Sequence, residues 1–421
     1  MATTTTSVAD ICAAAKQASR ILAAIDSNTK NAALEAIAAA LIERAPEILE
    51  ANELDLEAGR EAGLTAALMD RLHLNPARLA LIAGQVRDIA ALKDPVGEVV
   101  DGGRLANGLD FRKVRVPLGV IAVVYEARPN VTIDASALCL KSGNAIVLRG
   151  SSTAAHSNAI LASVASEAAT AAGLPEGALA LVAGGGHAEL EQLATQSGAV
   201  DLIIPRGGEG LKAALTRVAT VPVIYAASGN CHVFVDATAD LHDALAIILN
   251  AKTQRPSVCN AAETLLVHTA VAGEFVPNAL RALAAAGVEL RVDGRVRTLA
   301  GDTAVTDATQ EDWGTEFHAL TLAVGVVDSA PEAIEHINRY GSGHSDAIVT
   351  GDTASARAFQ LEVDSACVYV NASTRFTDGA EFGMGAEIGN STQKLHARGP
   401  IGLRELCAFK YLVEGAGTVR A

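Results

Sequence analysis

The sequence predicts an α/β protein built on doubly wound, mainly parallel sheets, and two observations support that prediction. Beyond about residue 110, short β-rich apolar runs alternate with segments of helical periodicity, which is typical of parallel strands joined by covering helices. The runs are apolar at nearly every position, as expected of strands buried on both faces. A chain of 421 residues exceeds the size at which one hydrophobic core stops growing, so two or more domains are expected.

The chain opens with a helical part, and a first α/β unit follows. From Val8 to Leu92 apolar residues recur at i, i+3 and i+4, which predicts helices throughout. Strands are then predicted at VIAVVYE, NAIVLRG, LALVAGG, VDLIIPRGG and VPVIYAA, with helices near 130–142, 153–172, 187–196 and 208–218.

A second α/β unit is predicted from about Gly229 onward, and Asp240 caps its first helix, DLHDALAIILNA. Its strands are expected at TLLVH, LTLAVGVV, DAIVT and ACVYV, with helices near 272–285, 330–338 and 353–362. The glycine-rich stretch 373–402 is weakly periodic, and long irregular segments in compact enzymes are often functional.

Composition excludes several classes of protein. The net charge of -15 and the aromatic content of 3% argue against a nucleic-acid partner, although a few arginines suffice to bind a phosphorylated small molecule. Six scattered cysteines show no metal-ligand spacing and no disulfide framework. No signal peptide or membrane span is evident, so we expect a soluble cytoplasmic protein.

Ligands of doubly wound sheets bind beyond the carboxyl ends of the strands. Three glycine-rich loops lie there: LRGSSTAAHSN, VAGGGHAEL and IPRGGEGLKAAL, with Arg149 and Arg206 supplying positive charge. No G-x-G-x-x-G follows the first strand, so the usual dinucleotide fingerprint is absent. Each loop taken alone is equally an ordinary glycine-rich turn.

Cys259 lies in the polar loop QRPSVCNAAET, outside the apolar runs. Two interpretations are open: an inert loop cysteine, or a reactive thiol activated by nearby positive charge. His232, His344 and His396 suggest a Cys–His protease, but no spacing pairs them with Cys259, and strand packing explains His232 better.

Several stretches, in the same order along the chain, resemble the aldehyde dehydrogenase superfamily, and within it the gamma-glutamyl phosphate reductase family. They run from about Arg115 to Gly402 and are VPLGVIAVVYEARPNVTIDASALCLKSGNAIVLRG, LIIPRGGEGL, QRPSVCNAAET, HSDAIVT, VYVNASTRFTDG and STQKLHARGPIGL. The resemblance implies an NADP-binding domain at 1–228 with a returning segment at about 371–400, a catalytic domain at 229–370, and an oligomerisation element at 401–421 plus about 104–117.

The resemblance also implies a reaction: NADPH-dependent reduction of L-glutamyl 5-phosphate to L-glutamate 5-semialdehyde and phosphate, in proline biosynthesis, through a thioester on Cys259. A homo-oligomer is implied, and glutamate 5-kinase is a plausible partner because glutamyl phosphate is labile. The Cys259 backbone N–H and the Asn130 amide are expected to stabilise the oxyanion, although an ungapped match favours Glu126, and Asn130 is equally a helix cap.

Arg128 and Arg255 are expected to lower the thiol pKa and bind the leaving phosphate, with surface salt bridges as the alternative. Arg375 is the candidate for the substrate's amino-acid group.

The cofactor residues follow from the same resemblance. Arg149 matches the position that binds the adenosine ribose or its phosphate, and Ser151 would not repel a 2′-phosphate, which favours NADP over NAD. The backbone at Gly207 and Gly208 can approach a pyrophosphate. Glu311 resembles the acid that binds the nicotinamide ribose, with an exposed glutamate as the alternative.

One departure from the superfamily is informative. Hydrolytic aldehyde dehydrogenases carry a glutamate in a pattern like ELGGK, whereas the stretch from Tyr225 to Cys231 has no acid. Without that base, phosphate rather than water should resolve the thioester in the reverse direction. A phosphate-independent aldehyde dehydrogenase and a non-catalytic nucleotide-binding protein of the same fold are the alternatives.

Overall fold

A computed structural model describes residues 6–184, 186–225 and 229–420. The chain forms two compact units. Unit 1 comprises Met1–Tyr225, Met384–Gly389 and Ile401–Ala421, and unit 2 comprises Ala226–Gly383 and Asn390–Pro400. The glycine-rich stretch is therefore divided between the two units. Among the described residues no helix is long and apolar enough to cross a membrane.

Unit 1 begins with the predicted helices. Side-chain caps start several of them: Asp26, for example, accepts the backbone N–H groups of Asn28 and Thr29. The helices are α1 (Val8–Leu22), α2 (Ser27–Glu43), α3 (Ala45–Glu61), α4 (Ala66–Leu72) and α5 (Pro76–Ala91). The prediction of a helical opening is confirmed.

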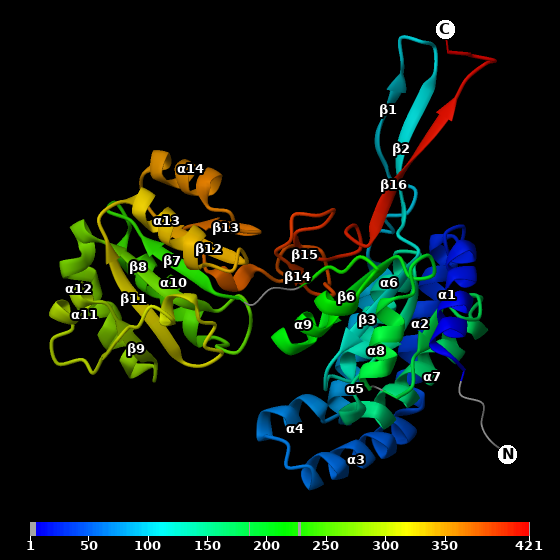
Figure 1. The fold of residues 1–421 in the computed structure, drawn as a ribbon, viewed down its shortest axis with the longest axis horizontal. Helices are drawn as coiled ribbons and strands as arrows, with labels where there is room; N and C mark the ends of the chain where they lie inside the picture. The colour runs from blue at the N-terminus through cyan, green and yellow to red at the C-terminus, as the bar shows by residue number, and fades with distance from the viewer. Residues whose placement is uncertain (1–5, 185, 226–228, 421) are drawn as a thin grey trace. The chain divides into compact units, whose positions relative to one another are not determined.

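The centre of unit 1 is a four-stranded parallel sheet of order β5-β4-β3-β6 (Figure 1). Strands β3 and β4 are buried at every position, in agreement with their apolar runs. The elements are β3 (Val120–Tyr125), α6 (Asn130–Lys141), β4 (Ala145–Arg149), η1 (Ser152–Ala154), α7 (Ala155–Ala171), β5 (Leu179–Leu181), α8 (His187–Ala194), β6 (Leu202–Arg206) and α9 (Glu209–Val218).

The strand predicted at VPVIYAA is wrong for its described residues, 221–225. Only one isolated bridge forms there, between Ile203 and Val223. Pro222 has no N–H to donate, so a continuous ladder cannot form at that position. Residues 226 and 227 of the predicted strand lie outside the described residues.

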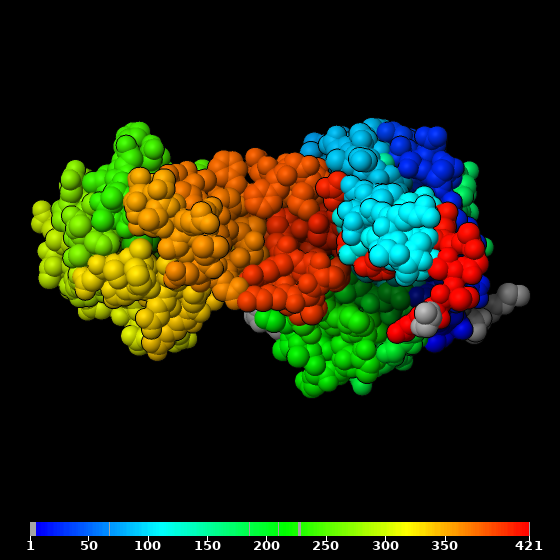
Figure 2. Space-filling model, turned by 90° about the horizontal axis from the view of Figure 1, so that it is seen from above, coloured from blue at the N-terminus to red at the C-terminus, as the bar shows by residue number. Residues whose placement is uncertain are grey.

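A separate three-stranded antiparallel sheet in unit 1 joins distant parts of the chain. Its strands β1 (Val99–Arg104), β2 (Asp110–Pro117) and β16 (Cys407–Glu414) have the order β1-β2-β16. It projects beyond the helices of unit 1, and its cyan and red residues lie side by side in both views (Figures 1 and 2). Every residue of β1 is exposed.

Unit 2 contains a seven-stranded parallel sheet of order β10-β9-β11-β8-β7-β12-β13. The predicted strands are confirmed as β8 (Ala262–His268), β11 (Thr321–Val327), β12 (Ser345–Val349) and β13 (Cys367–Val370); the others are β7 (Cys231–Val235), β9 (Glu289–Val292) and β10 (Thr306–Asp307). The helices are α10 (Leu241–Thr253), α11 (Thr269–Ala285), α12 (Gly294–Leu299), α13 (Ala330–Tyr340) and α14 (Thr353–Glu362).

Short elements complete unit 2: η2 (Asp312–Gly314), η3 (Thr374–Phe376), β14 (Asn390–Ser391) and β15 (Gly399–Pro400). Helices α10 and α11 pack against the sheet, and buried apolar residues of these helices and of the central strands form a hydrophobic core between them. The predicted α/β class with parallel sheets is confirmed.

Candidate active site

Cys259 lies in a turn between α10 and β8, which we call the nucleophile loop (residues 254–261). The N–H of Ala261 bonds the carbonyl of Val258, so the chain turns at the cysteine itself. Cys259 is exposed, whereas the other five cysteines, all described, are buried. Buried thiols in apolar surroundings are inert, so Cys259 is the reactive candidate.

A glycine allows the cysteine backbone to approach. A Cβ built on Gly229 would lie 1.6 Å from the Cys259 carbonyl oxygen, so no side chain fits there. The preceding residues 226–228, part of the stretch that lacks the superfamily glutamate, lie outside the described residues.

A fully buried ion pair closes the base of the nucleophile loop. Lys252, near the end of α10, bonds Glu263 in β8, and both side chains are 0% exposed. Burial raises the pKa of Glu263 to about 7, against the opposing effect of Lys252, and burial lowers the pKa of Lys252. Glu316, whose side chain is only 11% exposed and pairs with His318, adds negative charge near the pair.

Two arginines lie near Cys259 within unit 2. Arg255 is exposed in the loop itself, and Arg375 is half-buried in η3. The Nε of Arg375 donates to Gln254 Oε1 at 2.7 Å. Burial and the neighbouring Arg255 lower the Arg375 pKa, while Cys259 and Asp378 oppose that shift. The structure thus brings together three of the predicted residues, one thiol and two guanidinium groups.

The predicted residues of unit 1 gather at the carboxyl edge of the four-stranded sheet. Strands β4 and β5 are added on one side of β3 and β6 on the other, so the strand order reverses between β3 and β6 and creates a topological switch point there. Arg128 and Asn130 follow β3, Arg149 and Ser151 mark the end of β4, and residues 207–208 follow β6. Crevices at such switch points bind nucleotides.

Asn130 begins α6 and does not cap it, because its Nδ2 donates to Asp134 Oδ2 at 2.8 Å. Burial raises the pKa of Asp134 to about 6, opposed by the Asn130 hydrogen bond and by Arg206. One amide proton of Asn130 is thus used within α6. Its second proton can serve another acceptor.

Arg149 is only 7% exposed, and its Nη2 donates to the Gly186 carbonyl at 2.6 Å. Burial lowers its pKa, and Glu189 opposes that effect. Next to it, the Ser151 hydroxyl is buried and makes no hydrogen bond to the described residues. Asp55 from α3 holds the following helix by accepting the N–H groups of His156 and Ser157 at 3.1 and 2.8 Å.

The glycine pair after β6 leads into α9. The N–H of Gly208 lies 3.3 Å from Glu126 Oε2, and a Cβ on Gly207 would come within 2.8 Å of the same carboxyl group. Around Gly208 there is open space. Three groups in unit 1 fit the phosphates and ribose of a nicotinamide dinucleotide. They are the glycine backbone at the start of α9, the buried Ser151 hydroxyl and the buried Arg149 guanidinium.

Glu311 is exposed beside η2. Among the described residues, no contact joins it to the residues around Cys259 or to those at the edge of the unit 1 sheet. His232 is fully buried in β7, with its Nδ1 3.0 Å from Asp346 Oδ1, and His344 Nδ1 lies 2.8 Å from Ser345 Oγ. Both histidines are therefore buried in unit 2 and lie within hydrogen-bonding distance of a neighbouring side chain.

Sequence reasoning missed Lys252, Glu263 and Asp55. A signal existed for Lys252, which follows the buried Ile248 by four residues on α10, and for Glu263, an acid inside an apolar strand. Asp55 caps a helix that begins about a hundred residues later in the chain, which no local pattern reveals.

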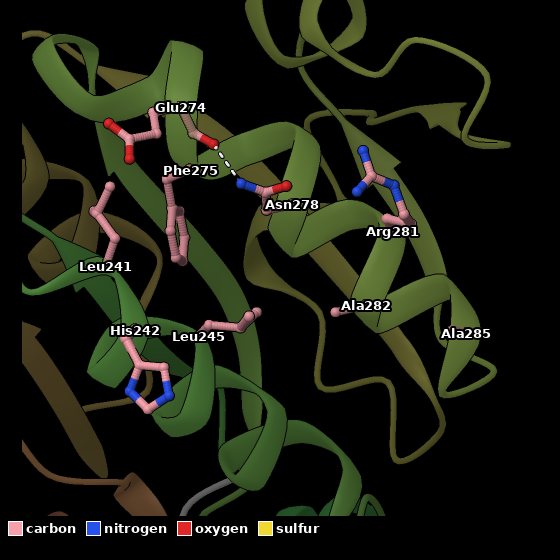
Figure 3. A pocket seen from close by; sticks show the side chains of 9 residues that line it. All are labelled: Leu241, His242, Leu245, Glu274, Phe275, Asn278, Arg281, Ala282 and Ala285. Atoms are coloured by element: carbon pink, nitrogen blue, oxygen red, sulfur yellow. Dashed lines mark hydrogen bonds between the residues drawn. The ribbon is translucent and has the colours of Figure 1, made fainter.

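A shallow cavity of about 540 Å³ lies away from these residues, between α10 and α11 (Figure 3). Leu241, Leu245 and Phe275 line it, and the Asn278 amide donates to the Glu274 carbonyl. The cavity contains none of the predicted site residues.

Comparisons with known proteins agree with the fold. The aldehyde dehydrogenase family profile matches residues 1–298, so the chain belongs to the aldehyde dehydrogenase family, whose enzymes use a nicotinamide cofactor. Within that family it groups with gamma-glutamyl phosphate reductases. The one from Thermobifida fusca is 54% identical over 406 residues, 96% of this chain and 97% of that protein.

Solved structures place it in the same group. The gamma-glutamyl phosphate reductase of Thermotoga maritima superimposes with a TM-score of 0.97 at 45% identity, over 99% of this chain and 100% of that one. An engineered glycolyl-CoA reductase with bound NADP⁺ shares the fold at 14% identity, with a TM-score of 0.67 over 96% of both chains.

Proposed function

We propose that the protein reduces L-glutamyl 5-phosphate to L-glutamate 5-semialdehyde, with NADPH as reductant and release of phosphate, in proline biosynthesis. The observation that carries the proposal is an exposed cysteine flanked by two arginines, in a chain about half identical to gamma-glutamyl phosphate reductases over nearly its full length. An acyl phosphate has a carbonyl carbon that a thiolate can attack. It also has a phosphate dianion that arginine side chains can bind.

The residues act in a defined order. The Cys259 thiolate attacks the acyl carbon, the bond from that carbon to the phosphate oxygen breaks, and phosphate leaves beside Arg255 and Arg128. A nicotinamide cofactor, when bound by the residues at the edge of the unit 1 sheet, would supply the hydride that reduces the thioester carbonyl. The carbon–sulfur bond then breaks, which releases the aldehyde and regenerates the thiolate.

Each tetrahedral stage carries an oxyanion. The Cys259 N–H and the second amide proton of Asn130 are the proposed donors, and loss of one such donor costs about 3 kcal/mol of barrier. Arg375 would bind the carboxylate of the amino-acid group. NADP is the proposed cofactor, with Arg149 and Ser151 at the 2′-phosphate, Gly207 and Gly208 at the pyrophosphate, and Glu311 at the nicotinamide ribose.

The deciding experiment runs the reaction in reverse, as NADP⁺ reduction by glutamate 5-semialdehyde with and without inorganic phosphate. Phosphate should accelerate turnover by at least about 100-fold, because the stretch from Tyr225 to Cys231 has no acidic residue to activate water. NAD⁺ in place of NADP⁺ should lower kcat/KM at least about tenfold. Equal rates without phosphate would reject the phosphate-linked reaction in favour of a hydrolytic aldehyde dehydrogenase.

We also propose that β16 forms the interface of a homo-oligomer. It is an edge strand among the described residues, and Phe409, Tyr411 and Val413 are 46%, 61% and 53% exposed. An exposed apolar edge strand is a template for pairing with another chain, and an identical strand of a second copy satisfies it.

Changing Tyr411 and Val413 to lysine should raise the dissociation constant of that oligomer at least about tenfold, because tyrosine is a frequent anchor of protein interfaces and charged lysines on an edge strand oppose its pairing. Sedimentation velocity of the wild-type and double-variant proteins measures the effect. Lys410→Ala, on the same strand, is the control. A monomeric wild-type protein, or an unchanged oligomer in the double variant, would contradict the proposal.

A further inference from the structure

The residue after the nucleophile ties its loop to a distant segment. Asn260 is only 4% exposed, and its Nδ2 donates to the carbonyls of Arg375 and Thr377 at 3.3 and 2.9 Å. In return, Thr374 Oγ1 donates to the Asn260 carbonyl at 2.7 Å. Three hydrogen bonds thus join the nucleophile loop to residues 373–377, which we call the arginine turn.

The peptide between Cys259 and Asn260 is held from its other side as well. The Cys231 thiol lies 3.2 Å from the Cys259 carbonyl oxygen, and burial raises the Cys231 pKa, so this thiol stays protonated and donates. Gly229 packs against the same carbonyl. Contacts on both sides restrain the backbone at this peptide.

The arginine turn is itself anchored in the sheet. The Thr377 hydroxyl lies 2.7 Å from the Tyr369 hydroxyl and 2.6 Å from Ser345 Oγ, and Ser345 is fully buried in β12. The side chain of Arg375 reaches back to Gln254 at the start of the nucleophile loop. The loop and the turn are therefore cross-linked at two places, through Asn260 and through Gln254.

We propose that Asn260 is a positioning residue that sets the geometry between the Cys259 thiol and the Arg375 guanidinium. The catalytic significance of this positioning rests on the proposed function, because that reaction requires the thiol and a guanidinium to contact the same substrate molecule. Its physical content is independent of the substrate: without the Asn260 carboxamide, the turn that presents Arg375 loses two of the three hydrogen bonds that it makes with Asn260 and keeps the one to Gln254.

The test compares alkylation of Cys259 by iodoacetate and by iodoacetamide, which are similar in size and differ in charge. A guanidinium held near the thiol accelerates the anionic reagent selectively. Asn260→Ala should lower the iodoacetate-to-iodoacetamide rate ratio roughly threefold to tenfold, the attraction expected of a unit charge at about 6 Å with an effective dielectric constant of about 40–80. Arg375→Gln should lower it similarly, and the double variant should show no further decrease.

Asn144→Ala is the matched control. Asn144 is fully buried in unit 1, and its Nδ2 donates to the Leu406 carbonyl and to Ser142 Oγ, so its loss removes comparable bonds away from Cys259. It should lower stability and leave the ratio unchanged. If Asn260→Ala does the same, Asn260 is merely structural and the inference fails.

Thr374→Val provides a milder variant if Asn260→Ala does not fold, since it removes only the bond to the Asn260 carbonyl. It should lower the ratio in the same direction by a smaller factor, and an unchanged ratio would contradict the inference. Because alkylation uses no glutamyl phosphate, a lowered ratio in a protein without reductase activity would reject the proposed function and keep the positioning role.

Discussion

Replacing Cys259 by alanine is expected to lower kcat by more than roughly 10⁴-fold, because the reaction loses its nucleophile and no second thiol is exposed. The assay is NADP⁺ reduction by glutamate 5-semialdehyde in saturating phosphate. Iodoacetamide should give a single adduct in the wild-type protein and none in the variant, since the remaining five cysteines are buried.

Cys139→Ala is the appropriate control for that result. Cys139 lies within α6, fully buried, and burial raises its pKa far above neutrality. Its loss should leave kcat within about threefold. Substantial turnover by Cys259→Ala, or alkylation of the native protein at another cysteine, would show that the thioester route is wrong.

Replacing Lys252 by methionine should lower the free energy of unfolding by about 3–5 kcal/mol at pH 8, because it leaves the Glu263 carboxylate buried without a cation. The loss should be smaller at pH 5. Burial raises the Glu263 pKa above its ordinary 4.5, so the folded variant takes up a proton more readily than the unfolded chain. Stability therefore falls as pH rises from 4.5 through the folded pKa, by up to about 1.4 kcal/mol per pH unit.

Urea denaturation at the two pH values measures this effect. Lys394→Met is the matched control, since Lys394 pairs with Asp364 on the surface, with side chains 64% and 55% exposed, and should cost less than about 1 kcal/mol. Adding Glu263→Leu to Lys252→Met should recover most of the stability, because paired apolar groups replace a buried ion pair well. No recovery would mean that Lys252 acts through something other than Glu263.

The parts of the fold that sequence predicted are those with strong periodicity or complete burial. The helices before residue 92 and strands such as β3 and β11 follow directly from their apolar patterns. Strand β1 was missed because all its residues are exposed and it contains two glycines, so it shows no apolar alternation. The run VPVIYAA is apolar enough for a strand, but Pro222 interrupts its pairing.

Site residues in local sequence motifs could be predicted, whereas those defined by contacts between distant parts of the chain could not. The family resemblance predicted Cys259 and Arg255 from one motif and Arg375 from another, because each motif is local in sequence. Asn260 was passed over since its partners lie more than a hundred residues later, and only the folded chain brings them together. Asn130 bonds Asp134 and does not cap α6, which no sequence pattern indicates, and its part as an oxyanion donor stays a prediction.

The β1-β2-β16 sheet also affects how the chain is made. Arg115 in β2 and Arg404, just before β16, are bonded although 289 positions separate them in sequence. At synthesis rates of about 5–20 residues per second, β2 waits roughly 15–60 s on the ribosome before its partner strand exists. During that time its open edge is a site for wrong pairing, so a strand translated late protects one translated much earlier.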